Sequence, residues 1–323
     1  MAQNAAMRAI QITSKGGPEV MKLEDVPEPE GDLIVGVEAI GVNFRDVYER
    51  EGRGAMYGRA PLPLIVGAEG AGTVLRGAGE FSEGARVAWA AAPGSYAERV
   101  AVPLKEAVPI PDGTTSEQAA AAILQGMTAH YLSQSTYPVQ AGDVCVVHAA
   151  AGGVGLLLTQ MIKARGGVVI ATTSTEEKAQ LARSAGADHS IGYDGFGERV
   201  LELTGGEGAH VIYDAIGATT FEEGIGVLRT RGMFVLYGMA SGPAPEYDPQ
   251  RLNPKSLYLT RPGLPGYTAT REELLQRASD VLGWIADGSL DVHIGERYPL
   301  ADAVRAHQDL EARRSTGKLL LVP

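Results

Sequence analysis

A glycine-rich turn near the middle of the sequence offers the clearest chemistry. The apolar run Val144–His148 leads into Ala-Ala-Ala-Gly-Gly-Val-Gly, in which Ala150, Gly152 and Gly155 hold the three small-residue places of a G-x-G-x-x-G pattern. Small residues let a strand-to-helix turn close tightly and let its backbone approach a pyrophosphate, which the N–H groups of a helix N-terminus bind. The pattern predicts a dinucleotide site, and a plain structural turn is the alternative. The expected contacts are Ala151, Gly152, Gly153 and Val154.

The end of the next predicted strand indicates which dinucleotide. Folds that bind NAD place a carboxylate about 20 residues beyond the first glycine, where it accepts from the ribose 2′-hydroxyl. The segment Ile170–Lys178 presents hydroxyls and an ammonium at that place instead. Thr173, Ser174, Lys178 and, from the following strand end, Tyr193 suit the 2′-phosphate of NADPH, which a carboxylate would repel. The sequence therefore favours NADPH over NADH, although Lys178 could also be an exposed helix lysine.

The elements around this turn alternate between strand and helix. The predicted strands are Val144–His148, Val168–Thr172, His189–Ile191, Val211–Asp214, Gly232–Tyr237 and Ser256–Thr260. The predicted helices are Val154–Ala164, Thr175–Ser184, Gly197–Leu203 and one from about Phe221. Continuous apolar strands between amphipathic helices predict a parallel sheet covered on both faces. Ligands bind at the carboxyl edge of such a sheet, which makes Ile216, Gly217, Gly238 and Met239 candidate contacts.

The flanking segments have a different pattern. The first ~110 residues read as short strands between Gly and Pro turns, as in a small barrel or sandwich. Ser116 is a candidate cap for a helix that runs to about Thr136. The last ~58 residues offer only the helices Arg271–Asp287 and Ala301–Leu310 and the strand Lys318–Val322, too little for a core. We therefore expect them to complete the N-terminal domain.

Composition limits the classes of protein. The 323 residues are 45% hydrophobic, which excludes a disordered or fibrous chain, and the net charge of −11 argues against nucleic acid and anionic membranes as partners. The single cysteine, Cys145, allows no intrachain disulfide and no cysteine-based structural zinc site. No signal-peptide pattern is seen at the N-terminus, so a cytoplasmic protein is expected.

Several motifs together resemble a known family. They are Gly41–Asp46, Gly67–Gly72, Ser95–Glu98, Gln125–Thr128, His148–Gly155, Thr172–Lys178, Gly186–Asp188, Thr260–Pro262 and Thr316–Lys318. The chain resembles the zinc-free quinone oxidoreductases, the zeta-crystallin branch of the medium-chain dehydrogenase/reductases, over essentially its whole length. The resemblance implies an α/β fold in which a Rossmann doubly wound sheet, residues 123–264, is inserted into a GroES-like β-rich catalytic domain, residues 1–122 and 265–323.

The resemblance also identifies a candidate catalytic position. Zinc-dependent relatives carry a cysteine and a histidine where this chain has Asn43 and Ala68, so we expect no metal. Asn43 is then the leading donor to the substrate oxygen and a cofactor neighbour, and a turn residue that caps its own backbone is the alternative. Tyr48 and Tyr57 are nearby phenols that would contact a flat substrate or pack as half-buried rings. Glu69 and Asp46 are expected to buttress turns.

The implied function is an NADPH-dependent reductase of quinones or similar electron-poor carbonyl compounds. The resemblance adds Thr128, Thr260, Arg261 and Lys318 as cofactor contacts, and it implies a homodimer. The predicted strand Ser256–Thr260 is a candidate edge strand that could pair across its two-fold axis. The alternatives are an enone or alkenal double-bond reductase on the same scaffold, or a crystallin-like or RNA-binding role. The acidic pI of about 5.1 opposes RNA binding.

Overall fold

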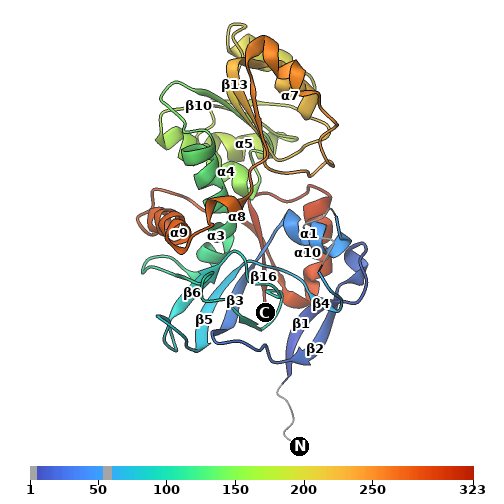
Figure 1. Ribbon diagram of the computed structural model, residues 1–323, viewed down its shortest axis with the longest axis vertical. Helices are drawn as coiled ribbons and strands as arrows, with labels where there is room; N and C mark the ends of the chain where they lie inside the picture. Colours follow the sequence, from blue (N-terminus) through green and yellow to red (C-terminus); the bar gives the residue numbers. More distant parts are fainter. Residues whose placement is uncertain (1–5, 54–59) are drawn as a thin grey trace, which may run out of the picture. The chain divides into compact units, whose positions relative to one another are not determined.

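The computed structural model describes residues 6–53 and 60–323, and the chain forms two compact units (Figure 1). The first comprises Met1–Leu124 with Thr270–Pro323, and the second is Gln125–Ala269. The boundaries predicted from the sequence lie at 122/123 and 264/265. In the described part of the chain, no helix is both long and apolar enough to cross a bilayer.

The second unit is built on a six-stranded parallel sheet. Its strands are β9 (Val144–Val147), β10 (Val168–Thr172), β11 (His189–Ile191), β12 (Ala209–Asp214), β13 (Leu228–Leu236) and β14 (Tyr258–Thr260). They lie in the order β11-β10-β9-β12-β13-β14, which is the 3-2-1-4-5-6 order of a Rossmann sheet and confirms the predicted fold class. The connecting helices are α4 (Gly153–Ala164), α5 (Glu176–Ser184), α6 (Phe196–Leu203) and α7 (Phe221–Gly226), followed after β14 by α8 (Leu264–Tyr267).

The first unit contains two sheets formed from both ends of the chain. A three-stranded sheet joins β2 (Lys22–Pro27), β1 (Ala6–Ile12) and β4 (Leu64–Ile65). A seven-stranded sheet runs β15 (Ile294–Pro299), β16 (Lys318–Val322), β3 (Ile34–Val42), β5 (Gly70–Arg76), β6 (Arg86–Trp89) and β8 (Val108–Pro109), with β7 (Arg99–Ala101) also paired to β3. Because β16 pairs with β3 through Leu320 and Gly41, the C-terminal segment completes the N-terminal sheet.

Helices of the first unit begin at polar caps. They are α1 (Phe44–Glu51), the first two turns of α3 (Ser116–Tyr131), α9 (Arg271–Ala286) and α10 (Ala303–Glu311). The predicted cap of α3 is wrong by one residue. Thr115 is the cap, because its hydroxyl accepts from the Gln118 amide and its own amide donates to the Gln118 side chain. After Tyr131 the chain continues as a π-helical turn over Leu132–Thr136.

Several elements were absent from the sequence prediction, among them α1, β2, β4, β8 and β15. Helix α1 has both of its signals, Asn43 at the N-cap and Gly52 in the left-handed conformation after its end, but is only eight residues long. Strands β2 and β15 are largely exposed and polar, so they show almost no apolar alternation. After β13, Pro249–Lys255 forms a 3-10 helix. Short 3-10 helices also cover Pro18–Val20 and Leu300–Asp302.

Candidate functional site

The glycine-rich turn joins β9 to α4 and leaves no room for larger side chains. A Cβ on Gly155 would lie 2.4 Å from the Ala149 carbonyl oxygen and 2.7 Å from the Ala150 Cα. Gly152 is the N-cap of α4, and the amide of Ala149 donates to the Tyr193 hydroxyl over 2.9 Å. The first N–H groups of an α-helix have no acceptor within the helix. The turn therefore brings the backbone of β9 and α4 close together and presents helix N-terminal N–H groups, the polarity that a pyrophosphate requires.

His148, just before this turn, packs in the interior of the second unit. It is fully buried, its Nδ1 lies 2.7 Å from the Thr172 hydroxyl, and its ring packs against Tyr193 and edge-on against Phe196. Burial lowers the pKa of His148 to about 4, so the ring is neutral near pH 7.

Hydroxyl side chains follow the end of β10, and a lysine lies in the first turn of α5, as the sequence predicts. Thr173 is buried and its amide donates to Ile191, whereas Ser174 is exposed. Thr175 caps α5 by accepting from the amide of Lys178, which places Lys178 in the first turn of that helix. The nearby carboxylate of Glu176 is held by Arg183 through a close ion pair.

Asp214 organises the carboxyl ends of β12 and β13. Its buried carboxylate accepts from the amides of Ile216 and Gly217, at 2.6 and 3.0 Å, and its backbone carbonyl accepts from Gly238. Gly217 has a φ of +91°, and a Cβ there would lie 2.5 Å from the Gly242 oxygen and 3.3 Å from the Cα of Met239. The two predicted pairs thus meet at one edge of the sheet.

Three other predicted cofactor contacts are spread over the second unit. Thr128 is a buried residue of α3, and Thr260 is the last residue of β14. Arg261 is exposed, and its guanidinium donates to the carbonyl of Pro262.

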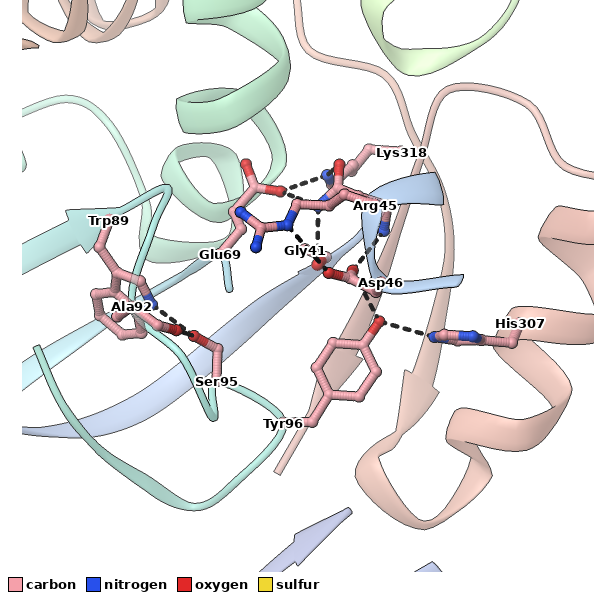
Figure 2. A network of polar contacts seen from close by, with 11 residues as sticks. Gly41, Arg45, Asp46, Glu69, Trp89, Ala92, Ser95, Tyr96, His307 and Lys318 are labelled. Atoms are coloured by element: carbon pink, nitrogen blue, oxygen red, sulfur yellow. Dashed lines mark hydrogen bonds and ion pairs between the residues drawn. The ribbon is translucent and has the colours of Figure 1, made fainter. Parts of the chain in front are cut away.

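The first unit contains a buried cluster of Asn43, Glu69 and Lys318, of which Glu69 and Lys318 are labelled in Figure 2. Lys318 Nζ lies 2.5 Å from Glu69 Oε2 and 2.7 Å from Asn43 Oδ1. The other carboxylate oxygen of Glu69 accepts from the Leu124 amide of α3. The side chains of Lys318 and Glu69 are 1% and 0% exposed, so the ammonium is the counter-ion of a carboxylate that is shielded from bulk solvent.

Two close approaches make this cluster possible. A Cβ on Gly41 would lie 2.1 Å from Glu69 Oε2 and 2.8 Å from the Ala120 carbonyl, so the last part of β3 needs glycine there. Ala68, at the place where zinc-dependent relatives have histidine, is 1% exposed. Within residues 6–53 and 60–323, no three His, Cys, Asp or Glu side chains gather as a metal site would require.

The contacts of Asn43 define what its side chain can do. It is the N-cap residue of α1, yet its amide group faces the cluster, with Nδ2 donating to Glu69 at 2.7 Å and to the Gly41 carbonyl at 3.2 Å. Both N–H groups have acceptors, and the bond to Gly41 is the longer one. Lys318 is likewise directed to Asn43 and Glu69.

The structure describes one of the two predicted phenols, Tyr48. Tyr48 lies in α1, is 6% exposed, and has its ring 6.2 Å from that of Phe44. Tyr57 lies outside the described residues.

Asp46 is the third residue of α1, three residues after the N-cap Asn43. Its Oδ2 accepts from the Asn43 backbone amide at 2.9 Å and from the Tyr96 hydroxyl at 3.2 Å, while Oδ1 has no hydrogen-bond partner among residues 6–53 and 60–323. Burial raises the pKa of Asp46 from 3.8 to about 7, against the opposing charge of Arg45. Sequence reasoning gave Asp46 and Glu69 a buttressing role, and no motif indicated that Tyr96 reaches the same place.

Comparisons with known proteins agree with this description. A family model described as an alcohol dehydrogenase GroES-like domain matches residues 29–112, and one described as a zinc-binding dehydrogenase matches residues 153–280. The chain is 42% identical to the quinone oxidoreductase of Pseudomonas aeruginosa, over 98% of this chain and 99% of that protein. It is 36% identical to the 2-haloacrylate reductase of a Burkholderia species, over 98% of each chain.

A solved structure extends the comparison. The crystal structure of Escherichia coli quinone oxidoreductase complexed with NADPH matches with a TM-score of 0.93 and 39% identity, covering 98% of this chain and 100% of that chain.

The raised pKa of Asp46 predicts how stability depends on pH. Between about pH 4 and 7 the folded chain keeps a proton on Asp46 that the unfolded chain releases, so this residue makes stability fall as pH rises through that range. Asp46→Asn should flatten the Tm-versus-pH curve there, measured by thermal unfolding. Asp112→Asn, at an exposed aspartate, should leave the curve unchanged. Equal slopes for the wild type and Asp46→Asn would contradict the assignment.

Proposed function

The chain belongs to the quinone oxidoreductases of the medium-chain dehydrogenase/reductase superfamily, and we propose that it is an NADPH-dependent reductase of quinones that works without a metal. The observation that carries the cofactor is the glycine-rich turn at the N-terminus of α4, where the backbone packs too closely for a Cβ on Gly155, beside the hydroxyls that follow β10 and Lys178 in the first turn of α5. When bound, NADPH supplies the hydride that reduces the substrate.

The proposed cofactor contacts follow the edge of the parallel sheet. The backbone of Ala151, Gly152, Gly153 and Val154 would receive the pyrophosphate, and Thr173, Ser174, Lys178 and Tyr193 the 2′-phosphate region. The Asp214-bound ends of β12 and β13, with Ile216, Gly217, Gly238 and Met239, would border the rest of the cofactor. Thr128, Thr260 and Arg261 remain proposed contacts.

We assign Lys318 a different role from a direct cofactor contact, because it is buried against Glu69 and Asn43. A cation on Oδ1 of Asn43 withdraws electron density from the amide and makes its N–H groups stronger donors. The N–H with the longer bond, to the Gly41 carbonyl, is the one available to turn to a substrate oxygen. Asn43 is therefore the proposed polarising group, with Lys318 and Glu69 fixing its orientation, and Tyr48 and Tyr57 are proposed substrate contacts.

Reduction of an activated alkene is the second candidate. It is favoured by the 36% identity to a 2-haloacrylate reductase, since a haloacrylate is an activated alkene. Hydride addition to such a carbon needs the same cofactor site, so only the substrate separates the two.

A substrate panel tests the function directly. We expect oxidation of NADPH, followed by its absorbance, with benzoquinone or naphthoquinone at a kcat/KM well above that for an enone or a haloacrylate, and no loss of rate with EDTA or phenanthroline. Faster turnover of the alkenes would favour the second candidate. Loss of activity with the chelators, restored by zinc, would overturn the metal-free proposal.

Lys178→Ala tests the choice of cofactor. Only NADPH carries the phosphate that the ammonium would meet, and a charge-assisted hydrogen bond contributes about 1.5–3 kcal/mol. We expect KM for NADPH to rise about 10-fold or more and KM for NADH to stay within about 2-fold. Lys105→Ala, at a lysine side chain that is 80% exposed in the other unit, is the control. Equal changes for both cofactors would remove Lys178 from the phosphate site.

A homodimer is proposed through β14. This strand is the edge of the six-stranded sheet, and its Tyr258 and Leu259 are 56% and 37% exposed. A second copy could continue the sheet across a two-fold axis. Sedimentation should give about twice the 33.9 kDa chain mass, with Leu259→Lys dissociating the dimer and Leu104→Lys, equally exposed in the first unit, leaving it intact. A monomeric wild type would refute this.

A cytoplasmic location is also proposed, to be checked by cell fractionation.

A further inference from the structure

Four buried side chains of the first unit form a continuous line of hydrogen bonds that ends at Asp46. Arg50 Nη1, in α1, lies 3.0 Å from His307 Nδ1, in α10. His307 Nε2 lies 3.0 Å from the Tyr96 hydroxyl, which in turn lies 3.2 Å from Asp46 Oδ2 (Figure 2). Arg50, His307, Tyr96 and Asp46 are each 0% exposed.

The chemistry of Arg50 fixes the direction of this line. A guanidinium only donates, so His307 Nδ1 must accept and the single ring proton of neutral His307 must be on Nε2. That proton is donated to the Tyr96 oxygen, which leaves the Tyr96 hydroxyl to donate to Asp46. Burial and the Arg50 charge lower the pKa of His307 to about 3, which keeps the ring in this neutral form. The Arg50 charge is itself balanced by Glu311 at 2.7 Å.

The segment that carries Tyr96 is held independently of this line. A Cβ on Gly67 would lie 2.1 Å from the Tyr96 ring, so the ring is seated on the backbone there. The neighbouring Ser95 accepts from the Trp89 indole at 2.9 Å and donates to the Ala92 carbonyl (Figure 2). Removing the Tyr96 hydroxyl alone should therefore leave the ring in place.

We propose that Tyr96 and His307 are positioning residues for the reductase reaction: the line from Arg50 through His307 and Tyr96 holds the Asp46 carboxylate on the backbone amide of Asn43 and so fixes Asn43 in the substrate site. The proposal rests on the proposed function, in which Asn43 polarises the substrate. Protonation of Asp46 weakens Oδ2 as an acceptor, and a proton placed on Oδ1 would find no hydrogen-bond partner in the described part of the chain.

The charged groups around Asp46 determine its response to pH. Arg45 Nε, 3.8 Å from Oδ1, and Glu49 come from α1, Lys318 comes from β16, and Tyr96 comes from the segment before β7, with neutral His307 of α10 behind it. The Tyr96 hydroxyl stabilises the ionised carboxylate, so its removal raises the pKa of Asp46. The form that holds Asn43 firmly then appears only at higher pH.

Tyr96→Phe, His307→Leu and His307→Gln test the line. The first two should lower kcat for a quinone about 5-fold near pH 7, leave KM for NADPH unchanged, and move the acidic limb of the kcat profile upward by about 0.5–1 pH unit. His307→Gln keeps an acceptor for Arg50 and a donor for Tyr96, so it should restore most of the rate. Tyr298→Phe is the matched control, because it removes a 2.9 Å bond to Asp309 in the same unit without a link to Asn43.

The outcomes separate this inference from the proposed function. A wild type without quinone turnover refutes the function. If the wild type is active and Tyr96→Phe matches Tyr298→Phe in kcat and in the position of the acidic limb, the positioning role is overturned, even if both variants lose stability. An upward shift of the limb with Tyr96→Phe and His307→Leu but not with Tyr298→Phe or His307→Gln supports it.

Discussion

The ion pair between Lys318 and Glu69 is the interaction on which the first unit depends. It joins the C-terminal strand to the segment before β5, and through Glu69 and Asn43 it also reaches α3 and α1. A charge buried without its partner costs about 3–5 kcal/mol, so neither residue can be exchanged alone. An ammonium, a carboxylate and an amide, all supplied by the chain, are thus held together by direct contacts in this cluster.

The second unit is organised by close backbone packing and one buried carboxylate. Its glycine-rich turn has no space for a Cβ on Gly155. At the carboxyl edge of the sheet, Asp214 binds the backbone after β12 through its carboxylate and the backbone after β13 through its carbonyl. Preorganised N–H groups and a single buried anchor give a rigid surface for an anionic cofactor. Each unit therefore contains a buried carboxylate that orients the groups around it, Glu69 in the first and Asp214 in the second.

The sequence predicted the second unit well and the first unit incompletely, for physical reasons. Buried parallel strands are continuous apolar runs, and β9 to β13 stand out as such. β2 and β15 are exposed edge elements whose polar residues carry no period. Lys318 looked like a late basic contact because sequence shows charge but not burial. The Arg50–His307–Tyr96 line joins residues up to 257 positions apart, and no local pattern encodes such a meeting.

The position of β16 between β15 and β3 has a consequence for how the chain is made. The nucleotide-binding unit is one continuous stretch, so it can fold as soon as its last strand leaves the ribosome. The other unit must wait with an open gap beside β3, because the strand that fills it, together with the counter-ion of Glu69, is synthesised after the whole of the inserted unit. During synthesis, the second unit should therefore fold before the first unit is complete.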